Sequence, residues 1–282
     1  MGVALSPEQI ERGYNNRAAV PDHPAWLARW GERSREAIAA LAPRLDTRYG
    51  PGPKETLDVF LPPGPPRGTF VFMHGGYWRS LDKAEHAFVA PAFVAEGFAV
   101  VLPNYDLCPA VSIGDIADEM TRAIAFLLHE GARIGVPAKP LVVSGHSAGG
   151  HLAAMLLATR AATLGWPTHP VTGAVSLSGV HDLEPLVHFS YNVDLKLDVP
   201  HARAWSPVHM AAHTRAPLLV SVGAQETGEF LRQTDLMWDA WPDNRPPGAT
   251  APLVVPDRHH FSVVMDYEDR DSALTRATVA LF

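Results

Sequence analysis

Short runs of apolar and β-branched residues alternate along the chain with longer segments that have the hydrophobic spacing of helices. The runs that predict strands lie at residues 57–61, 69–73, 99–102, 141–144, 173–177, 218–222 and 252–255. The segments that predict helices lie at residues 83–96, 113–131, 148–160, 229–241 and 271–281. This alternation predicts an α/β fold, in which helices cover both faces of a mostly parallel central sheet.

Two segments stand outside this repeating pattern. Residues 1–50, which contain Trp26, Trp30 and an Ala-rich stretch, predict a helical N-terminal extension. Residues 183–214 separate two predicted strands by more than a usual α/β loop, and we expect them to form a lid or a wall of a substrate pocket. Because 47% of the residues are hydrophobic, we expect residues 1–282 to form a single domain with a sizeable core.

Composition and charge indicate which kinds of molecule the protein binds. The 282 residues carry a formal net charge of -7, which argues against nucleic acid and anionic membranes and favours a small-molecule substrate. The single cysteine, Cys108, excludes an internal disulfide and a cysteine-based zinc cage. The first residues lack the features of a secretion signal and no apolar run reaches about 18 residues, so the cytoplasm is the expected compartment. A homodimer is compatible with the sequence.

The stretch VSGHSAGG at residues 143–150 contains the pattern G-x-S-x-G around Ser147. An apolar run precedes it and a good helix former follows it, which predicts the strand, sharp turn and helix of a nucleophile elbow. Gly145 and Gly149 suit a turn that leaves no room for Cβ atoms. We therefore predict Ser147 as a catalytic nucleophile, the alternative being a structural glycine-rich turn.

A second motif follows the predicted strand at residues 69–73, which runs directly into His74, Gly75 and Gly76. In α/β-hydrolases an HGG loop after an early strand supplies N–H groups to the oxyanion, together with the residue after the nucleophile. The predicted oxyanion hole therefore consists of the N–H groups of Gly75, Gly76 and Ala148. Taken alone, HGG is equally typical of a plain tight turn.

A serine nucleophile needs a base and an acid that orients the base, and in this fold they follow in the order serine, acid, histidine. Glu226 is the first carboxylate after the strand predicted at residues 218–222. His259 and His260 follow the last predicted strand, and spacing alone favours His260 only slightly. We predict His260 as the general acid/base and Glu226 as the acid that orients it.

Other polar residues offer rival assignments. Glu229 and Asp182 also follow strand ends and are weaker candidates for the acid. His74, His146 and His151 are expected to pack or to form hydrogen bonds rather than to act as the base. The remaining histidines lack H-E-x-x-H or a comparable spacing, so we predict no metal and no cofactor.

Five motifs resemble those of one enzyme family. They are HGGYW at 74–78, GHSAGGHLAAM at 145–155, LSGVHDLEPL at 177–186, GEFLRQ at 228–233 and HHF at 259–261. Through them the chain, from about residue 69 to residue 264, is similar to kynurenine formamidase (arylformamidase) of the α/β-hydrolase superfamily. The resemblance implies an α/β-hydrolase fold and hydrolysis of N-formyl-L-kynurenine to formate and kynurenine, a step of tryptophan catabolism.

The resemblance also bears on the site. The family's G-x-x-D-S-P-E-F motif matches residues 223–230 and places Glu226 where the family has Asp, and its D-H-F motif places the catalytic histidine at His260. Glu serves as the triad acid in some α/β-hydrolases. Tyr77 and Trp78 are candidate walls for an aromatic substrate, or alternatively core aromatics. Two other functions stay open: a carboxylesterase or aryl-amidase for small esters, amides or carbamates, and a non-catalytic small-molecule receptor.

Overall fold

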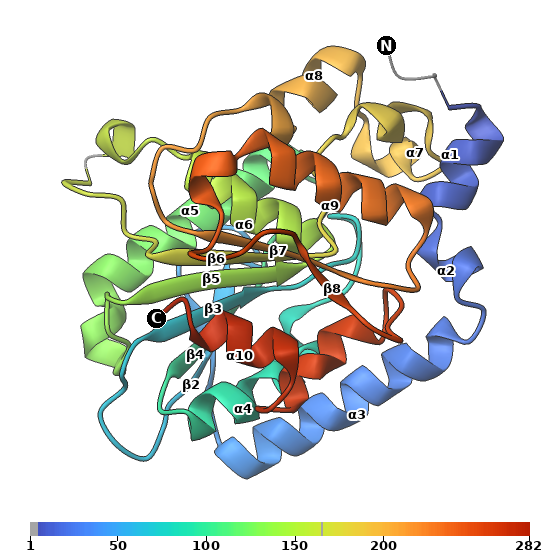
Figure 1. Ribbon diagram of the computed structural model, residues 1–282. Coiled ribbons are helices and arrows are strands. Elements are labelled where there is room, and N and C mark those ends of the chain that lie inside the picture. Colours follow the sequence, from blue (N-terminus) through green and yellow to red (C-terminus); the bar gives the residue numbers. More distant parts are fainter. Residues whose placement is uncertain (1–4, 165) are drawn as a thin grey trace.

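A computed structural model describes residues 5–164 and 166–282, and within this part of the chain an eight-stranded sheet forms the centre (Figure 1). The order of the strands across the sheet is β1-β2-β4-β3-β5-β6-β7-β8. Strands β3 to β8 are parallel, and β2 runs antiparallel to both β1 and β4. The strands are β1 (Arg44–Arg48), β2 (Thr56–Phe60), β3 (Thr69–Met73), β4 (Ala99–Pro103), β5 (Leu141–His146), β6 (Gly173–Leu177), β7 (Leu218–Gly223) and β8 (Leu253–Val255).

Helices cover both faces of the sheet, with α5, α6 and α9 on one face and α3, α4 and α10 on the other (Figure 1). Alternating side chains of one strand point to opposite faces, so Val71 and Met73 join the first core while Phe70 and Phe72 join the second. The helices are α1 (Pro7–Tyr14), α2 (Asn16–Ala19), α3 (His23–Leu41), α4 (Ala90–Ala95), α5 (Ile113–Glu130), α6 (Ala148–Ala158), α7 (Asn192–Leu195), α8 (Val199–Ala204), α9 (Gly228–Ala240) and α10 (Ala273–Val279).

The segment 83–96 differs from the single helix that its pattern predicts. It begins with two short 3-10 turns, η1 (Lys83–Glu85) and η2 (Ala87–Val89), and only then forms α4. Pro91 lies in the first turn of α4. Since proline lacks an N–H group and its ring clashes with the preceding turn, an α-helix can begin at this point but cannot run through it.

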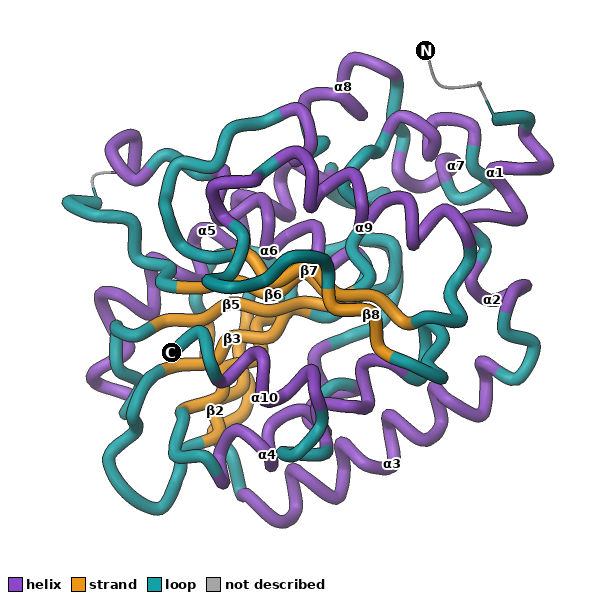
Figure 2. The backbone as a smooth tube through the Cα atoms, in the orientation of Figure 1, coloured by secondary structure: helices purple, strands orange, loops and turns teal. Residues whose placement is uncertain are grey.

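The N-terminal extension is helical only as far as Leu41. Residues 44–48 form β1, an edge strand that the apolar pattern did not predict because its side chains are mostly exposed. Glu11, on α1, accepts hydrogen bonds from the backbone N–H and the hydroxyl of Ser190. This contact joins the extension to the insertion at residues 183–214, and Figure 2 shows α1 beside the short helices of the insertion.

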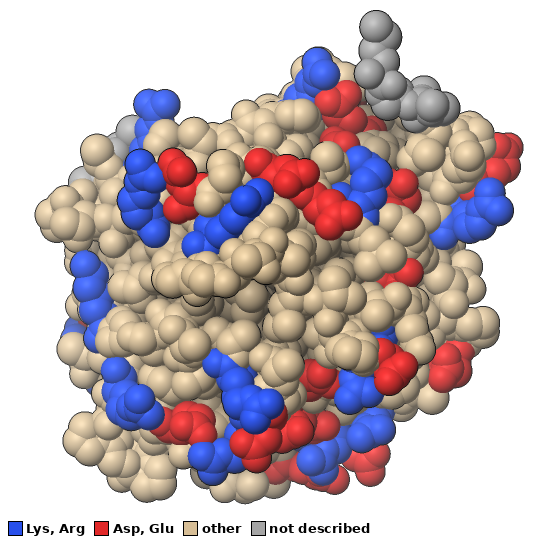
Figure 3. Space-filling model, viewed as in Figure 1, with Lys and Arg blue, Asp and Glu red and all other residues tan. Residues whose placement is uncertain are grey.

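The insertion itself consists of short helical pieces. They are η5 (Glu184–His188), α7, α8 and η6 (Pro207–His209). On the face of the molecule in Figure 3, lysines and arginines are interspersed with acidic residues rather than gathered in one basic area. None of the described helices is long and apolar enough to cross a membrane.

Buried histidines should make the fold sensitive to acid. Burial lowers the pKa of His86 to about 3, of His151 to about 4 and of His181 to about 3. Below the unfolded value of about 6.5, the unfolded chain therefore binds more protons than the folded chain. We expect the free energy of unfolding, measured with urea, to fall between pH 7.5 and pH 5.5, with each histidine contributing at most about 1.4 kcal/mol per pH unit.

A pair of variants isolates the histidine contribution. His181→Gln should flatten this pH dependence because it removes one buried titrating ring, whereas Val193→Ala, at an exposed residue that does not titrate, should leave it as in the wild type. An identical slope for the two variants would contradict the assignment.

Candidate active site

Ser147 lies in the sharp turn between β5 and α6. Its backbone has φ 58° and ψ −117°, a combination that a residue with a side chain rarely adopts. The turn depends on close packing behind it, since a Cβ atom on Gly149 would lie 2.0 Å from the carbonyl oxygen of Met73 at the end of β3. The sequence therefore folds here as the strand, turn and helix that the G-x-S-x-G pattern predicts.

Ser147 opens into a small cavity of about 50 Å³. Its lining includes His260 from the loop after β8, and Gly76 and Tyr77 from the loop after β3. The structure brings Ser147 and His260 to this cavity but shows no hydrogen bond between them. Such looseness is common in catalytic sites before substrate binds.

A buried acid orients the His260 ring. Nδ1 of His260 lies 2.6 Å from Oε2 of Glu226, whose side chain is completely buried. The other carboxylate oxygen, Oε1, accepts a hydrogen bond from the hydroxyl of Ser178 and one of 2.9 Å from the N–H of Gly223. These donors satisfy the carboxylate and fix its direction, so that the opposite ring nitrogen of His260 is left for other contacts.

Ser178 is a residue that sequence reasoning missed. It directly follows β6, in the LSGVHDLEPL motif, and has a positive φ of 52°. The position of a hydroxyl at the end of the strand beside β7 was a usable signal, because the ends of neighbouring parallel strands meet at one edge of a sheet.

The rival residues lie elsewhere. Nδ1 of His259 accepts hydrogen bonds from backbone N–H groups of its own loop, and its ring meets the edge of Trp26. Glu229 forms an ion pair of 2.9 Å with Arg232, and Asp182 lies 3.6 Å from the same guanidinium group. None of these three rivals lines the cavity at Ser147.

The HGG loop lies against the nucleophile turn. A Cβ atom on Gly75 would be 3.1 Å from Cβ of Ser147, and Gly76 lines the cavity with a φ of +107° that favours glycine. Within the described residues, the N–H groups of Gly75 and Gly76 have no hydrogen-bond acceptor. Ala148, the third predicted donor, is the first residue of α6, where N–H groups point out of the helix end. These positions suit donors to a developing oxyanion.

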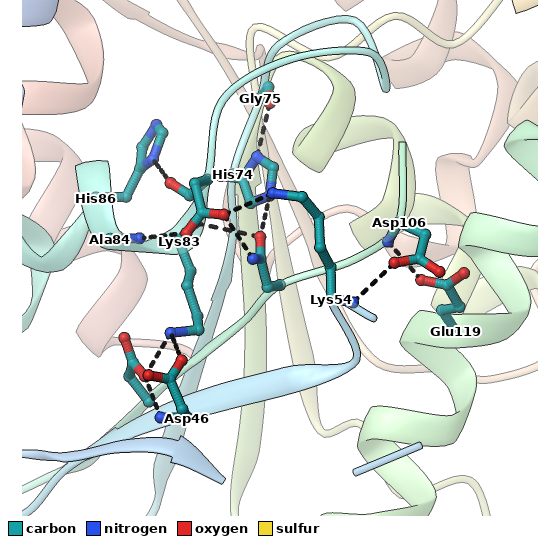
Figure 4. Close-up of polar contacts among 12 residues, drawn as sticks. Asp46, Lys54, His74, Gly75, Lys83, Ala84, His86, Asp106 and Glu119 are labelled. Atoms are coloured by element: carbon teal, nitrogen blue, oxygen red, sulfur yellow. Dashed lines mark hydrogen bonds and ion pairs between the residues drawn. The ribbon is translucent and has the colours of Figure 1, made fainter. Parts of the chain in front are cut away.

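A polar network that begins at the buried residues His74 and Asn104 and ends at the partly exposed Asp82 and Lys54 supports this loop (Figure 4). Nδ1 of His74 lies 2.8 Å from the carbonyl oxygen of Gly75, and Nε2 lies 2.9 Å from Oδ1 of Asn104. The amide of Asn104 donates to Asp82 at 2.7 Å, and Lys54 contacts the same carboxylate oxygen at 2.8 Å. The expectation that His74 is a structural residue agrees with this placement.

The network also sets the charges under the loop. Burial lowers the pKa of His74 to about 4, although its hydrogen bonds oppose that shift. Burial opposes the shift of Asp82, but hydrogen bonds from Lys54 and Asn104 lower its pKa to about 2. Asp82 is therefore a carboxylate at neutral pH, and its charge is balanced by Lys54.

Tyr77 and Trp78, the two aromatic residues after HGG, lie in different environments. Tyr77 lines the cavity, but Trp78 is fully buried and its ring meets His151 edge-on in the core. The expectation that Trp78 is a wall of the pocket therefore does not agree with its position. His146, expected to be a packing residue, also lines the cavity, and neither of its ring nitrogens has a hydrogen-bond partner.

Among the described residues, one group of side chains has the spacing of metal ligands: Asp182, Glu184 and His209. Glu184 is paired with Arg203, and Asp182 lies near Arg232. Since these cations already neutralise both carboxylates, the group has the character of a surface ion-pair network rather than of a metal site.

Comparison with known proteins identifies the family to which the chain belongs. The BD-FAE family matches residues 57–227, which is more than half of the chain. The chain belongs to the BD-FAE family. The match runs from β2 to the residue after Glu226, so it spans Ser147 and the HGG loop.

This chain is 29% identical over 284 residues to a kynurenine formamidase of Salmo salar, and the alignment covers 96% of this chain and 92% of the relative. A crystal structure from Silicibacter sp. TM1040, provisionally assigned as a thioesterase, is 32% identical with a TM-score of 0.84 and covers 96% of this chain and 99% of that one. Esterase B from Lactobacillus rhamnosis, with 17% identity, a TM-score of 0.68 and coverage of 95% and 96%, shares the fold alone.

The protein is therefore a hydrolase with the α/β-hydrolase fold, and it is similar to kynurenine formamidases. The resemblance predicted from the five sequence motifs is confirmed.

Replacing Gly149 with alanine should disrupt the nucleophile turn. The new Cβ would collide with the backbone of β3, so we expect a loss of roughly 3 kcal/mol or more in the free energy of unfolding, measured with urea. Gly228→Ala is the matched control, because a Cβ atom there meets nothing within 4 Å. Equal stabilities for the two variants would show that the packing argument is wrong.

Proposed function

We propose that the chain hydrolyses a small acyl amide or ester through a Ser147–His260–Glu226 triad, and that its substrate is N-formyl-L-kynurenine. One observation carries the proposal: Ser147 and His260 line one cavity beside the HGG loop, and the buried carboxylate of Glu226 holds the His260 ring from behind. The sequence order of the three residues and the similarity to kynurenine formamidases along nearly the whole chain support it.

The proposed chemistry follows from these positions. Ser147 Oγ attacks the formyl carbon while His260 Nε2 takes its proton, and Glu226 stabilises the resulting imidazolium. The N–H groups of Gly75, Gly76 and Ala148 hold the oxyanion, a contribution of roughly 3 kcal/mol for each well-placed donor. His260 then passes the proton to the departing aniline nitrogen. Water repeats the sequence on the formyl ester of Ser147 and releases formate.

The shape of the site favours a small acyl group joined to an aromatic ring. The cavity at Ser147 is small, about 50 Å³, which suits a formyl group. Tyr77, Trp30 and Phe261 also line it and offer faces and edges to an aryl ring.

A second candidate is a hydrolase of small esters or thioesters. It is favoured by the Silicibacter structure provisionally assigned as a thioesterase, which is 32% identical to this chain. A non-catalytic receptor is disfavoured, since a receptor would have no need of a buried acid aligned on the ring of His260.

Rates on two substrates would separate these functions. We expect kcat/KM for N-formyl-L-kynurenine to exceed that for p-nitrophenyl acetate by roughly 100-fold or more, equivalent to about 2.7 kcal/mol of transition-state discrimination. Ser147→Ala should abolish both activities. Turnover of esters through Ser147 with no hydrolysis of N-formyl-L-kynurenine would overturn the formamidase proposal and leave the esterase.

The acid can be tested separately from the nucleophile. Glu226→Gln should lower kcat by about 10³-fold to 10⁴-fold, because an amide neither fixes the ring tautomer nor stabilises the imidazolium. Glu226→Asp should retain more activity because the charge remains, and Glu130→Gln, which makes the same change in a surface ion pair at the end of α5, should match the wild type. A kcat for Glu226→Gln within about 10-fold of the wild type would exclude Glu226 as the acid.

A further inference from the structure

One wall of the cavity at Ser147 comes from the N-terminal extension. Asn16 and Arg17, at the start of α2, line the cavity together with Tyr77 of the HGG loop. Two contacts hold this segment in place: the hydroxyl of Tyr77 donates to the carbonyl oxygen of Tyr14 at 2.6 Å, and the hydroxyl of Thr227 donates to the carbonyl oxygen of Gly13. The extension is thus tied both to the HGG loop and to the loop that carries Glu226.

Asn16 has an unused donor at this wall. Its side chain is only 5% exposed, and its Nδ2 atom has no hydrogen-bond partner. A buried amide donor without an acceptor is unfavourable, so an acceptor that binds beside it gains a hydrogen bond that the empty site lacks. Because Asn16 lines the cavity, a ligand in the cavity can supply that acceptor.

Arg17 adds a charge beside that donor. Its side chain is exposed, and no acidic residue in the described part of the chain pairs with it. The described lining of the cavity contains no Asp or Glu, so Arg17 supplies the full positive charge there in a protein of net charge -7. Two donors, one of them cationic, complement an anion with planar oxygen acceptors.

We propose that Asn16 and Arg17 form a carboxylate subsite, and that they select substrates whose leaving group is an aromatic amine or alcohol bearing a carboxylate. The inference rests on the proposed function, in which the kynurenine part of the substrate carries such a group. Aromatic side chains line the same cavity as Asn16, Arg17 and Ser147, so an aryl ring bound there can present its acyl group to Ser147 and its carboxylate to Arg17. The N-terminal extension is then a specificity element rather than only a cover for the sheet.

Matched substrates measure this selectivity. The first pair is N-formyl-L-kynurenine and its carboxamide, and the second is 3-acetoxybenzoate and 3-acetoxybenzamide, so each pair differs only in the carboxylate charge. For each pair, the measured quantity is the ratio of kcat/KM for the charged substrate to kcat/KM for the neutral one. We expect this ratio to fall by roughly 10-fold or more in Arg17→Ala, chiefly through KM, and less in Arg17→Lys, which keeps the charge without the planar fork.

Two further variants sharpen the result. Asn16→Asp replaces the donor by a negative charge of nearly the same shape and should lower the ratio further. Arg12→Ala removes an exposed arginine of the same extension that does not line this cavity, and should leave the ratio at the wild-type value. A ratio in Arg17→Ala equal to that in Arg12→Ala overturns the carboxylate subsite.

The two substrate pairs distinguish failure of the subsite from failure of the proposed function. If N-formyl-L-kynurenine is not hydrolysed but the ratio for the acetoxy pair falls in Arg17→Ala, the subsite stands and the formamidase assignment fails. If N-formyl-L-kynurenine is hydrolysed and both ratios are insensitive to Arg17, the assignment stands and the subsite fails.

Discussion

The contact between the start of α6 and the end of β3 is the constraint on which the site depends. Gly149 packs so closely on the carbonyl oxygen of Met73 that no side chain fits between them. This contact holds Ser147 in its strained turn and, because Met73 leads directly into the HGG loop, it also sets the distance between that loop and the serine. One packing contact thus places both the proposed nucleophile and the proposed oxyanion donors.

Buried polar groups then direct the remaining parts of the site. Glu226 accepts from Ser178 at the end of β6 and from Gly223 at the end of β7, and it contacts His260 from the loop after β8. Three neighbouring strand ends therefore meet on one carboxylate. Because this carboxylate is buried, a misaligned arrangement would be unfavourable. A buried charge that loses a hydrogen bond is destabilised far more than an exposed charge, which water can solvate.

The N-terminal extension completes the cavity that the sheet leaves open. Its backbone oxygens at Gly13 and Tyr14 accept hydrogen bonds from the loops on either side of the site, and Glu11 joins it to the insertion. The helical segments outside the repeating α/β pattern are in this way tied to the loops that bear the chemistry. Substrate choice in such a protein can change through these segments while the sheet and the serine turn stay as they are.

Local pattern by itself determined the sheet and the nucleophile turn. The strands at 69–73 and 173–177 agree with the structure at both ends, because fully buried parallel strands are continuous apolar runs. The edge strand β1 was not predicted, because its side chains are mostly exposed and it therefore has no continuous apolar run. Spacing alone did not separate His260 from its neighbour His259; the family resemblance favoured His260, and the tertiary structure showed its contact with Glu226. Only the tertiary structure revealed Ser178, Asn104 and Asn16. Their roles arise from contacts between segments far apart in the chain, and no local periodicity encodes which polar side chains will face one another once the sheet has formed.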